Sequence, residues 1–389
     1  MRRTWIVFLK ETLDNLRDRR TLLTSLLLGP LLGPLLFVLI MNTMLKERIS
    51  DLEKPLQLPV IGSEYAPNFI QFMRENNTAI LPGPENAEQA IRDREHSVVM
   101  IIRDEYTENF VAGLPARVQL VFDASDRDAD KDVSRARRLV NAYSRQIGAL
   151  RLMARGVDPR AMHAITLDDV DISTPEARGV LLLGIVPYFV ILTIMMGGFY
   201  LAIDTTAGER ERGSLEPLLC TAATRAELAT GKLMATTLFA ILSLVIVLIS
   251  FHYGGNLIEL ERLGMTANLS VSVMTNIFIV ALPFTLLGSA MLTVIASFTR
   301  SFKEAQTWLS IVLLVPAFPA FIPLLYPVKM EMWMMLVPSY NISALIMEYM
   351  KDKNIPDMFV TVTIVTNLVL GILLSWLAIH LYKREKVLG

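Results

Sequence analysis

The sequence predicts an α-helical membrane protein with six transmembrane helices and a large external α/β domain between the first and second helices. Three observations support this prediction. Of the 389 residues, 53% are hydrophobic, and they are concentrated in runs too long for the amphipathic patterns of a soluble fold. A stretch of ordinary soluble composition separates the first two runs. Lysine and arginine collect on alternate flanks of the runs, as they do in multi-pass membrane proteins.

The transmembrane helices are predicted from length, because a spanning helix needs about 20 mostly apolar residues. The runs that meet this requirement cover residues 21–44, 179–203, 233–251, 271–298, 307–326 and 358–382. The first run follows a charged amino terminus, as the core of a signal peptide would. It is longer than such a core, and no A-x-A-like cleavage site follows it, so we expect it to be retained.

The basic residues predict the orientation of the chain. They are frequent in residues 1–20, in residues 204–232, in "TRSFKE" after the fourth run and in the tail, residues 383–389. With six spans, all four segments fall on the same side of the membrane. The positive-inside rule makes this side cytoplasmic, so both termini are expected in the cytoplasm and residues 45–178 outside.

Two further segments are predicted to lie at the membrane surface. Residues 1–20 carry Trp5, Leu9, Leu13 and Leu16 at helical spacing, which predicts an amphipathic helix in the inner interface. Residues 327–357 form an outer loop whose apolar part is interrupted by proline and asparagine. We expect short interfacial or re-entrant helices there.

The external region, residues 45–178, reads as a small α/β domain. Residues 56–62, 96–103 and 117–125 are rich in Val, Ile, Leu and Phe and predict strands, with helices between them. A long helix is predicted from about residue 131 to residue 154.

Three aspartates at alternate positions, Asp126, Asp128 and Asp130, could indicate a calcium-binding loop. An EF-hand loop that begins at Asp126 needs glycine at its sixth position and glutamate at its twelfth, which here are Lys131 and Arg137. No metal site is therefore predicted.

Several kinds of chemistry are excluded. Lys232 follows Gly231, but a phosphate-binding loop also needs glycine at position 226 and a hydroxyl at position 233, which are Ala226 and Leu233. No catalytic motif is recognisable, so we expect neither an enzyme nor a bound cofactor. The net charge of -1 gives no support for nucleic-acid binding, and Cys220, the single cysteine, allows no disulfide framework.

One charged segment interrupts the apolar sequence: "GERERGSLEPLLCTAATRAELATGKL", residues 208–233. Pro217 breaks its helix, and Thr224 with Glu227 has the form of a capping box that starts the next one. We expect a helix–break–helix turn that exposes residues 209–212 beside an apolar patch. Such a surface is typical of docking sites, and the alternative is a solvated loop that only obeys the positive-inside rule.

This segment closely resembles the GERE-x-G-[ST]-LE-x-LL…R-x-E-[LI]-x-x-GK signature of ABC-2-type transporter permeases. The resemblance extends over essentially the whole chain, through "KETLDNLRDRRTLLTSLLLGPLL" at the start and "SFTRSFKEAQ" between the fourth and fifth runs. The layout with an external α/β domain most resembles sodium-extruding NatB-type permeases.

The resemblance implies a permease in the bacterial inner membrane that forms a homodimer or heterodimer and contacts membrane lipid. It also implies two cytoplasmic ATPase subunits, which would carry ATP and Mg. Residues 204–232 would couple the permease to them, with Gly231 and Lys232 at the start of the following helix. The coupling positions carried over from the signature are Glu209, Arg210, Glu211, Gly213, Leu215 and Glu216.

The substrate is the open part of the prediction. Sodium efflux follows from the resemblance, and export of a drug, lipid or other amphipathic molecule is the alternative. A rival of another class is a membrane-anchored sensor or scaffold whose external domain binds a ligand. Five polar residues could line a sodium path: Thr193, Asp204, Asn276, Thr285 and Ser289. Interhelical packing explains each of them as well.

Overall fold

The structure is a computed structural model, and it describes residues 2–19, 22–162, 165, 167–214, 217–218, 221–266, 268–326 and 329–383. The chain divides into two compact units. The first comprises Met1–Leu45 and Ile172–Gly389, and the second comprises Lys46–Asp171.

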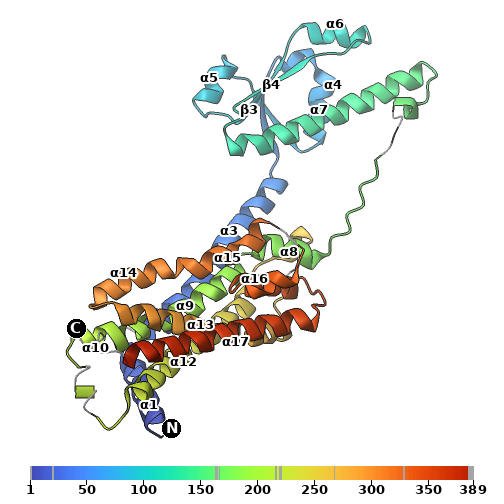
Figure 1. The fold of residues 1–389 in the computed structure, drawn as a ribbon. Coiled ribbons are helices and arrows are strands. Elements are labelled where there is room, and N and C mark those ends of the chain that lie inside the picture. The colour runs from blue at the N-terminus through green and yellow to red at the C-terminus, as the bar shows by residue number, and fades with distance from the viewer. Residues whose placement is uncertain are drawn as a thin grey trace. The chain divides into compact units, whose positions relative to one another are not determined.

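The first unit is helical (Figure 1). Its elements are α1 (Arg2–Arg17), η1 (Leu22–Leu32), the first part of α3 (Gly33–Glu53), α8 (Pro175–Leu183), α9 (Val186–Ile203), η4 (Asp204–Gly208), α10 (Glu209–Glu211), α12 (Arg225–Gly255), η5 (Leu260–Leu263), α13 (Val271–Phe298), α14 (Phe302–Val312), α15 (Leu314–Leu325), η6 (Met332–Leu336), α16 (Tyr340–Met350) and α17 (Asp357–Lys383).

Among the described residues, six helical stretches are long and apolar enough to cross a membrane. They run from Ser25–Glu47, Val186–Glu211, Arg225–Gly255, Val271–Phe298, Phe302–Leu325 and Asp357–Tyr382. The prediction of a mostly helical protein is therefore confirmed, and six helices have the length and composition of the predicted membrane spans. The predicted stretch 179–203 is divided in the structure, because α8 ends at Leu183 and α9 begins only at Val186, next to Pro187.

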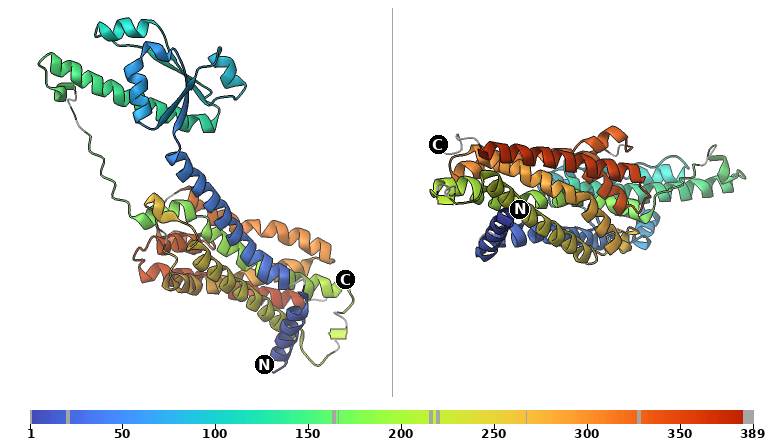
Figure 2. Two further views of the ribbon diagram at one scale, coloured as in Figure 1. Left: turned by 180° about the vertical axis from the view of Figure 1, so that it is seen from behind. Right: turned by 60° about the horizontal axis from the view of Figure 1, so that its bottom comes forward.

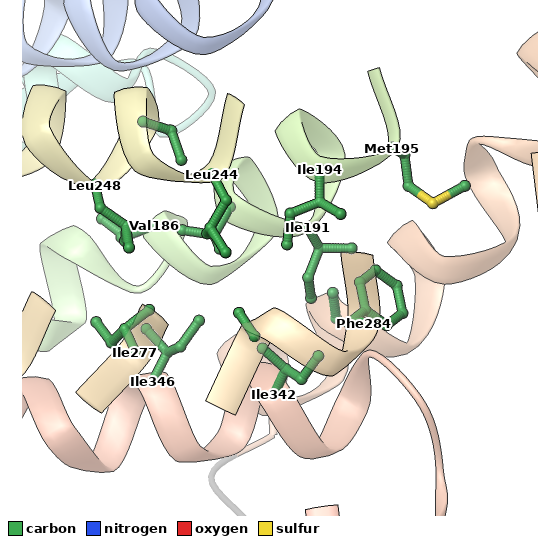
Figure 3. Packing of buried hydrophobic residues seen from close by; sticks show 14 of the residues in the cluster. Val186, Ile191, Ile194, Met195, Leu244, Leu248, Ile277, Phe284, Ile342 and Ile346 are labelled. Atoms are coloured by element: carbon green, nitrogen blue, oxygen red, sulfur yellow. The ribbon is translucent and has the colours of Figure 1, made fainter. Parts of the chain in front are cut away.

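The core of the helical unit forms where α9 packs against α12 and α13, with α17 along α13 (Figures 1 and 2). Glycines allow a close approach between α9 and α12: a Cβ on Gly197 would lie 2.4 Å from the Ser243 hydroxyl. Figure 3 shows buried side chains from these helices and from α16, among them Val186, Ile191, Ile194, Leu244, Leu248, Ile277, Phe284, Ile342 and Ile346.

The short helix α16 belongs to this core. Its residues from Tyr340 to Met347 are buried, and Ser343 donates a hydrogen bond of 2.7 Å to the Ala320 carbonyl of α15. Short interfacial or re-entrant helices were expected within residues 327–357, and the structure packs one of them, α16, among the long helices.

The second unit contains a four-stranded sheet in the order β2-β1-β3-β4. Its strands are β1 (Leu56–Ile61), β2 (Thr78–Pro82), β3 (Val98–Ile102) and β4 (Val118–Phe122). Strand β1 pairs in parallel with β2 and β3, and β4 is antiparallel to β3. The helices are α4 (Pro67–Glu75), α5 (Ala87–Arg92), α6 (Glu105–Val111) and α7 (Arg127–Ala154), with short turns η2 (Ser63–Tyr65) and η3 (Pro159–Met162).

Helices cover both faces of this sheet. Residues of α4 and α7 pack on the face that carries Leu58 and Met100, and α5 packs on the face that carries Val99. Beneath α7, the rings of Tyr106 and Phe110 stack 5.6 Å apart, and burial raises the pKa of Tyr106 to about 12. The second unit therefore has its own hydrophobic core.

Candidate coupling site

The charged motif begins as a direct continuation of α9. Residues 204–208 form a π-helical turn, η4, and Glu209–Glu211 form the last helical turn, α10. The helix ends at Gly213, whose φ of 68° is the left-handed conformation that glycine adopts at helix ends. The side chains at positions 209, 210 and 211 thus leave the helix in three different directions.

Glu209 is buried, with only 7% of its surface exposed, so the expectation that the turn exposes it is wrong. Because α9 continues through η4 beside α12, it presents Glu209 to Lys232, which is itself 1% exposed. The Lys232 ammonium donates to the Glu209 carboxylate, and it donates a second hydrogen bond of 2.8 Å to the Thr205 carbonyl. The glutamate and lysine of the motif therefore form a buried ion pair.

The third hydrogen bond of Lys232 is made to the last span, α17. Its Nζ donates to the hydroxyl of Tyr382 over 3.0 Å, and Tyr382 is 4% exposed in the final turn of α17. All three N–H groups of the ammonium thus have acceptors. This matters because an unpaired charge in a low-dielectric interior is strongly destabilising.

Arg210 turns toward the end of α13. Its guanidinium donates 3.1 Å to the Ser297 carbonyl and also to the Thr299 carbonyl, both of which lie where α13 ends. The last carbonyls of a helix have no partner within the helix, and a cation satisfies them well. Arg210 therefore joins α10 to the carboxyl end of α13.

Glu211 turns toward the start of α14 and remains exposed. Its carboxylate accepts a hydrogen bond of 2.6 Å from the Phe302 N–H, the first residue of α14. A carboxylate is favoured at a helix amino terminus by the free N–H groups and by the helix dipole. The neighbouring Arg212 bonds Asp204 at 2.8 Å, and this bond raises the pKa of Arg212.

The amino-terminal helix α1 packs against the other part of the motif (Figure 2). A Cβ on Gly231 would lie 2.7 Å from a methyl carbon of Val7, so only glycine allows α1 to approach this closely. Arg3 of α1 donates to the Ala222 carbonyl. Glu11, on the same helix, is buried and bonds Lys10 at 3.0 Å.

The helix after the break starts as predicted. The Thr224 hydroxyl accepts from the Glu227 N–H over 3.2 Å, and the Glu227 carboxylate accepts from the Thr224 N–H over 2.9 Å. This capping box is confirmed. Gly213 is exposed at the preceding turn, whereas Leu215 and Glu216 lie outside the described residues.

The five residues proposed for a substrate path occupy separate positions. Asp204 is bound to Arg212, and Asn276 is exposed on α13. Thr285 donates within α13, to the Leu282 carbonyl at 2.7 Å. The Ser289 hydroxyl is buried and, within the described part of the chain, has no hydrogen-bond partner.

Thr193, the fifth residue, lines a groove between η1 and α9. The cavity has a volume of about 340 Å³. Thr193 is 3% exposed. The lining residues are Leu28, Gly29, Gly33, Phe189, Leu192, Thr193, Met196 and Tyr200.

The same groove explains the glycines of the first span. Gly33 faces Phe189 so closely that a Cβ would lie 2.9 Å from its ring, and Gly29 is one of the residues that line the groove. Within residues 2–383, apart from the gaps given above, no group of three His, Cys, Asp or Glu side chains is placed to hold a metal ion.

Two residues of the site were missed or misjudged from the sequence. Lys232 was expected only to begin a helix, although a lysine inside an apolar helix is itself a signal of a buried partner. Tyr382 carries no such signal, because a tyrosine near the end of a span is ordinary in a membrane protein. Only the fold brings it to Lys232, which lies 150 positions away.

The apolar bundle and its charged junction are those of a multi-pass membrane protein. Residues 20–380 match the family described as "ABC-2 family transporter protein", and the chain belongs to this family. The chain is also 24% identical over 344 residues to the ABC transporter permease protein NatB of Bacillus subtilis (strain 168). That alignment covers 87% of each protein. A permease of this family implies a partner ATPase subunit, which favours the permease over the sensor or scaffold alternative.

Proposed function

We propose that the chain is the permease subunit of an ATP-driven exporter and that residues 204–232 couple it to a separate ATPase subunit. The observation that carries this proposal is the set of hydrogen bonds that joins the motif to other helices. Three consecutive residues, Glu209, Arg210 and Glu211, bond to α12, to the end of α13 and to the start of α14. A displacement of this turn would be transmitted to several helices at once, as coupling to a moving partner requires.

The contact surface itself would be the exposed part of the motif. Glu211, Arg212 and Gly213 are exposed, and they precede the break at Pro217. Glu209 and Arg210 would act behind this surface, since their side chains are engaged inside the permease. Leu215 and Glu216 are proposed as further contact positions from the family signature.

We also propose that this end of the helical unit faces the cytoplasm. The contacts Arg3–Ala222, Glu211–Phe302 and Lys232–Tyr382 join α1, the motif and the start of α14, which carry basic residues, and the last turn of α17. The positive-inside rule supports a cytoplasmic side for such a gathering. Both termini would then be cytoplasmic, residues 46–171 would lie outside the inner membrane, and the exposed apolar helix faces would contact lipid.

The rest of the complex follows from the same proposal. Two permease copies, most simply a homodimer, would pair with two ATPase subunits. ATP and Mg would bind to those subunits, and this chain would hold no cofactor and hydrolyse nothing.

For the substrate we propose sodium, moved outward. The support is the resemblance of the motif and domain layout to sodium-extruding NatB-type permeases. Hydroxyl and carbonyl oxygens of the spans would supply the ligands, with Thr193, Thr285 and Ser289 as the buried candidates.

A second substrate class, amphipathic molecules, is favoured by the groove between η1 and α9. Its walls are almost entirely apolar, and Thr193 and Tyr200 supply its hydroxyl groups. Ligand sites for small organic molecules combine these two features. An apolar tail would lie against Leu28 and Met196, with a polar group at Thr193.

Inverted membrane vesicles that contain the permease with its cognate ATPase distinguish these proposals. ATP-driven uptake of ²²Na⁺ would support sodium export, and ATP-driven uptake of a lipophilic dye without sodium would support the amphipathic class. A permease that binds no ATPase and moves neither probe would refute the exporter proposal itself.

A further inference from the structure

The contact between Lys232 and Tyr382 links the coupling motif to the last span. Tyr382 lies in the final turn of α17, a helix that packs along α13 over its length. Lys232 lies near the start of α12 and holds both Glu209 and Tyr382. The series of hydrogen bonds Glu209–Lys232–Tyr382 therefore joins the motif, through α12, to α17.

The chemistry of these hydrogen bonds makes them sensitive to small displacements. The Lys232 ammonium donates its three hydrogen bonds to acceptors on Thr205, Glu209 and Tyr382, and all four residues are buried. Water cannot replace a lost acceptor without entering the interior. A shift of Glu209 must therefore carry Lys232 with it, or leave a charge unpaired.

The position of Glu209 ensures that such shifts reach it. It precedes Arg210 and Glu211 in the same short turn, α10, and the exposed residues 211–213 follow directly. Any force applied to the exposed turn is thus applied to the partner of Lys232.

We propose that Lys232 and Tyr382 are positioning residues of the coupling junction, through which movement of the motif is passed to α17. The inference rests on the proposed coupling of residues 204–232 to an ATPase. It adds a role for the last span that the exposed motif residues alone do not give.

The key variant is Tyr382→Phe, which removes one acceptor and keeps the ring. The assembled permease–ATPase complex is reconstituted in vesicles, and three quantities are measured: co-purification of the ATPase, the ATP hydrolysis rate, and ATP-driven uptake of ²²Na⁺ and of a lipophilic dye. We expect unchanged co-purification and uptake per ATP hydrolysed that is lower by at least about tenfold, the loss that corresponds to one hydrogen bond to a charged group.

A matched control is Tyr340→Phe. Tyr340 is also buried, and its hydroxyl donates to the Met334 sulfur over 3.4 Å, in α16 and η6. This variant should keep the wild-type uptake per ATP.

A second variant separates positioning from folding. Replacing both charges, Glu209→Leu with Lys232→Met, leaves no unpaired charge, so its unfolding temperature should lie closer to wild type than that of either single variant. Its uptake per ATP should nevertheless fall as in Tyr382→Phe.

Each contrary result has a distinct meaning. Wild-type uptake per ATP in Tyr382→Phe, or in the double variant, would overturn the positioning role while leaving the proposed function intact. Loss of ATPase binding in Tyr382→Phe would overturn it too, because the residue would then maintain the docking surface. A wild-type permease that binds no ATPase would overturn both proposals.

Discussion

Lys232 and Tyr382 are 150 positions apart in the chain, yet the ammonium of one donates to the hydroxyl of the other over 3.0 Å. The same ammonium is bound to Glu209. The charged motif is therefore not only a surface feature. Its two ends, Glu209 and Lys232, meet inside the permease, and five predictions follow the contacts outward from this point.

Lys232→Met should destabilise the permease by about 3–5 kcal/mol, because it leaves the Glu209 carboxylate buried without its cation. The measurement is thermal unfolding in detergent. Lys303→Met is the control, since Lys303 is exposed and should change stability little. Equal melting temperatures for the two variants would contradict the buried ion pair.

Gly231→Ala should push α1 away from α12. The added Cβ would lie 2.7 Å from Val7 and 3.0 Å from the Thr4 carbonyl, an overlap that costs about 1–3 kcal/mol. Limited proteolysis of α1 is the measurement, and we expect faster cleavage. The double variant with Val7→Ala should recover part of the protection, and no recovery would show that the contact is not the cause.

Glu227→Ala should fray the start of α12 by removing one half of the capping box. Loss of such a cap costs about 0.5–2 kcal/mol. Hydrogen exchange of residues 225–228 should become faster, while exchange near Ser243 stays slow. Uniformly faster exchange along α12 would instead indicate global destabilisation.

Glu211→Lys should weaken binding of the ATPase, because Glu211 lies on the exposed part of the motif and the change reverses its charge. Co-purification of the two subunits is the measurement. Glu261→Lys, an exposed glutamate in η5, is the matched control and should bind normally. Normal binding by Glu211→Lys would remove this residue from the contact surface.

Gly29→Leu should fill the groove between η1 and α9. If the groove holds the apolar part of an amphipathic substrate, dye uptake should fall roughly tenfold, the scale on which pockets reject added methylenes. ATP hydrolysis without substrate should be retained. Unchanged dye uptake would show that the groove is not on the transport path.

Much of this architecture could be predicted from the sequence because its signals are local. Long apolar runs predicted the six spans, and Thr224 with Glu227 predicted the start of α12. Three of the strands were predicted from runs of β-branched and aromatic residues. Strand β2 was missed because "TAILP" is short and ends in proline, which is unfavourable within a strand.

The interior of the junction could not be predicted, because it depends on which helices meet. A sequence shows that Glu209 is charged, and a charge at the end of a span is expected to face water. Glu209 is buried in the structure because Lys232, on α12, supplies the compensating charge. The pairing with Tyr382 depends on how α17 packs, and no local pattern encodes it.

The neighbours Gly231 and Lys232 also limit how the length of this region can vary. They lie on one helix and serve two contacts, Gly231 with α1 and Lys232 with Glu209 and Tyr382. One residue inserted between Thr224 and Gly231 would rotate both by about 100° around α12 if the cap were kept, and both contacts would be lost together. Insertions between Gly213 and Thr221, which precede the cap, would cause no such rotation. Deletion and insertion scanning should therefore find that these two contacts become sensitive to length abruptly at the capping box.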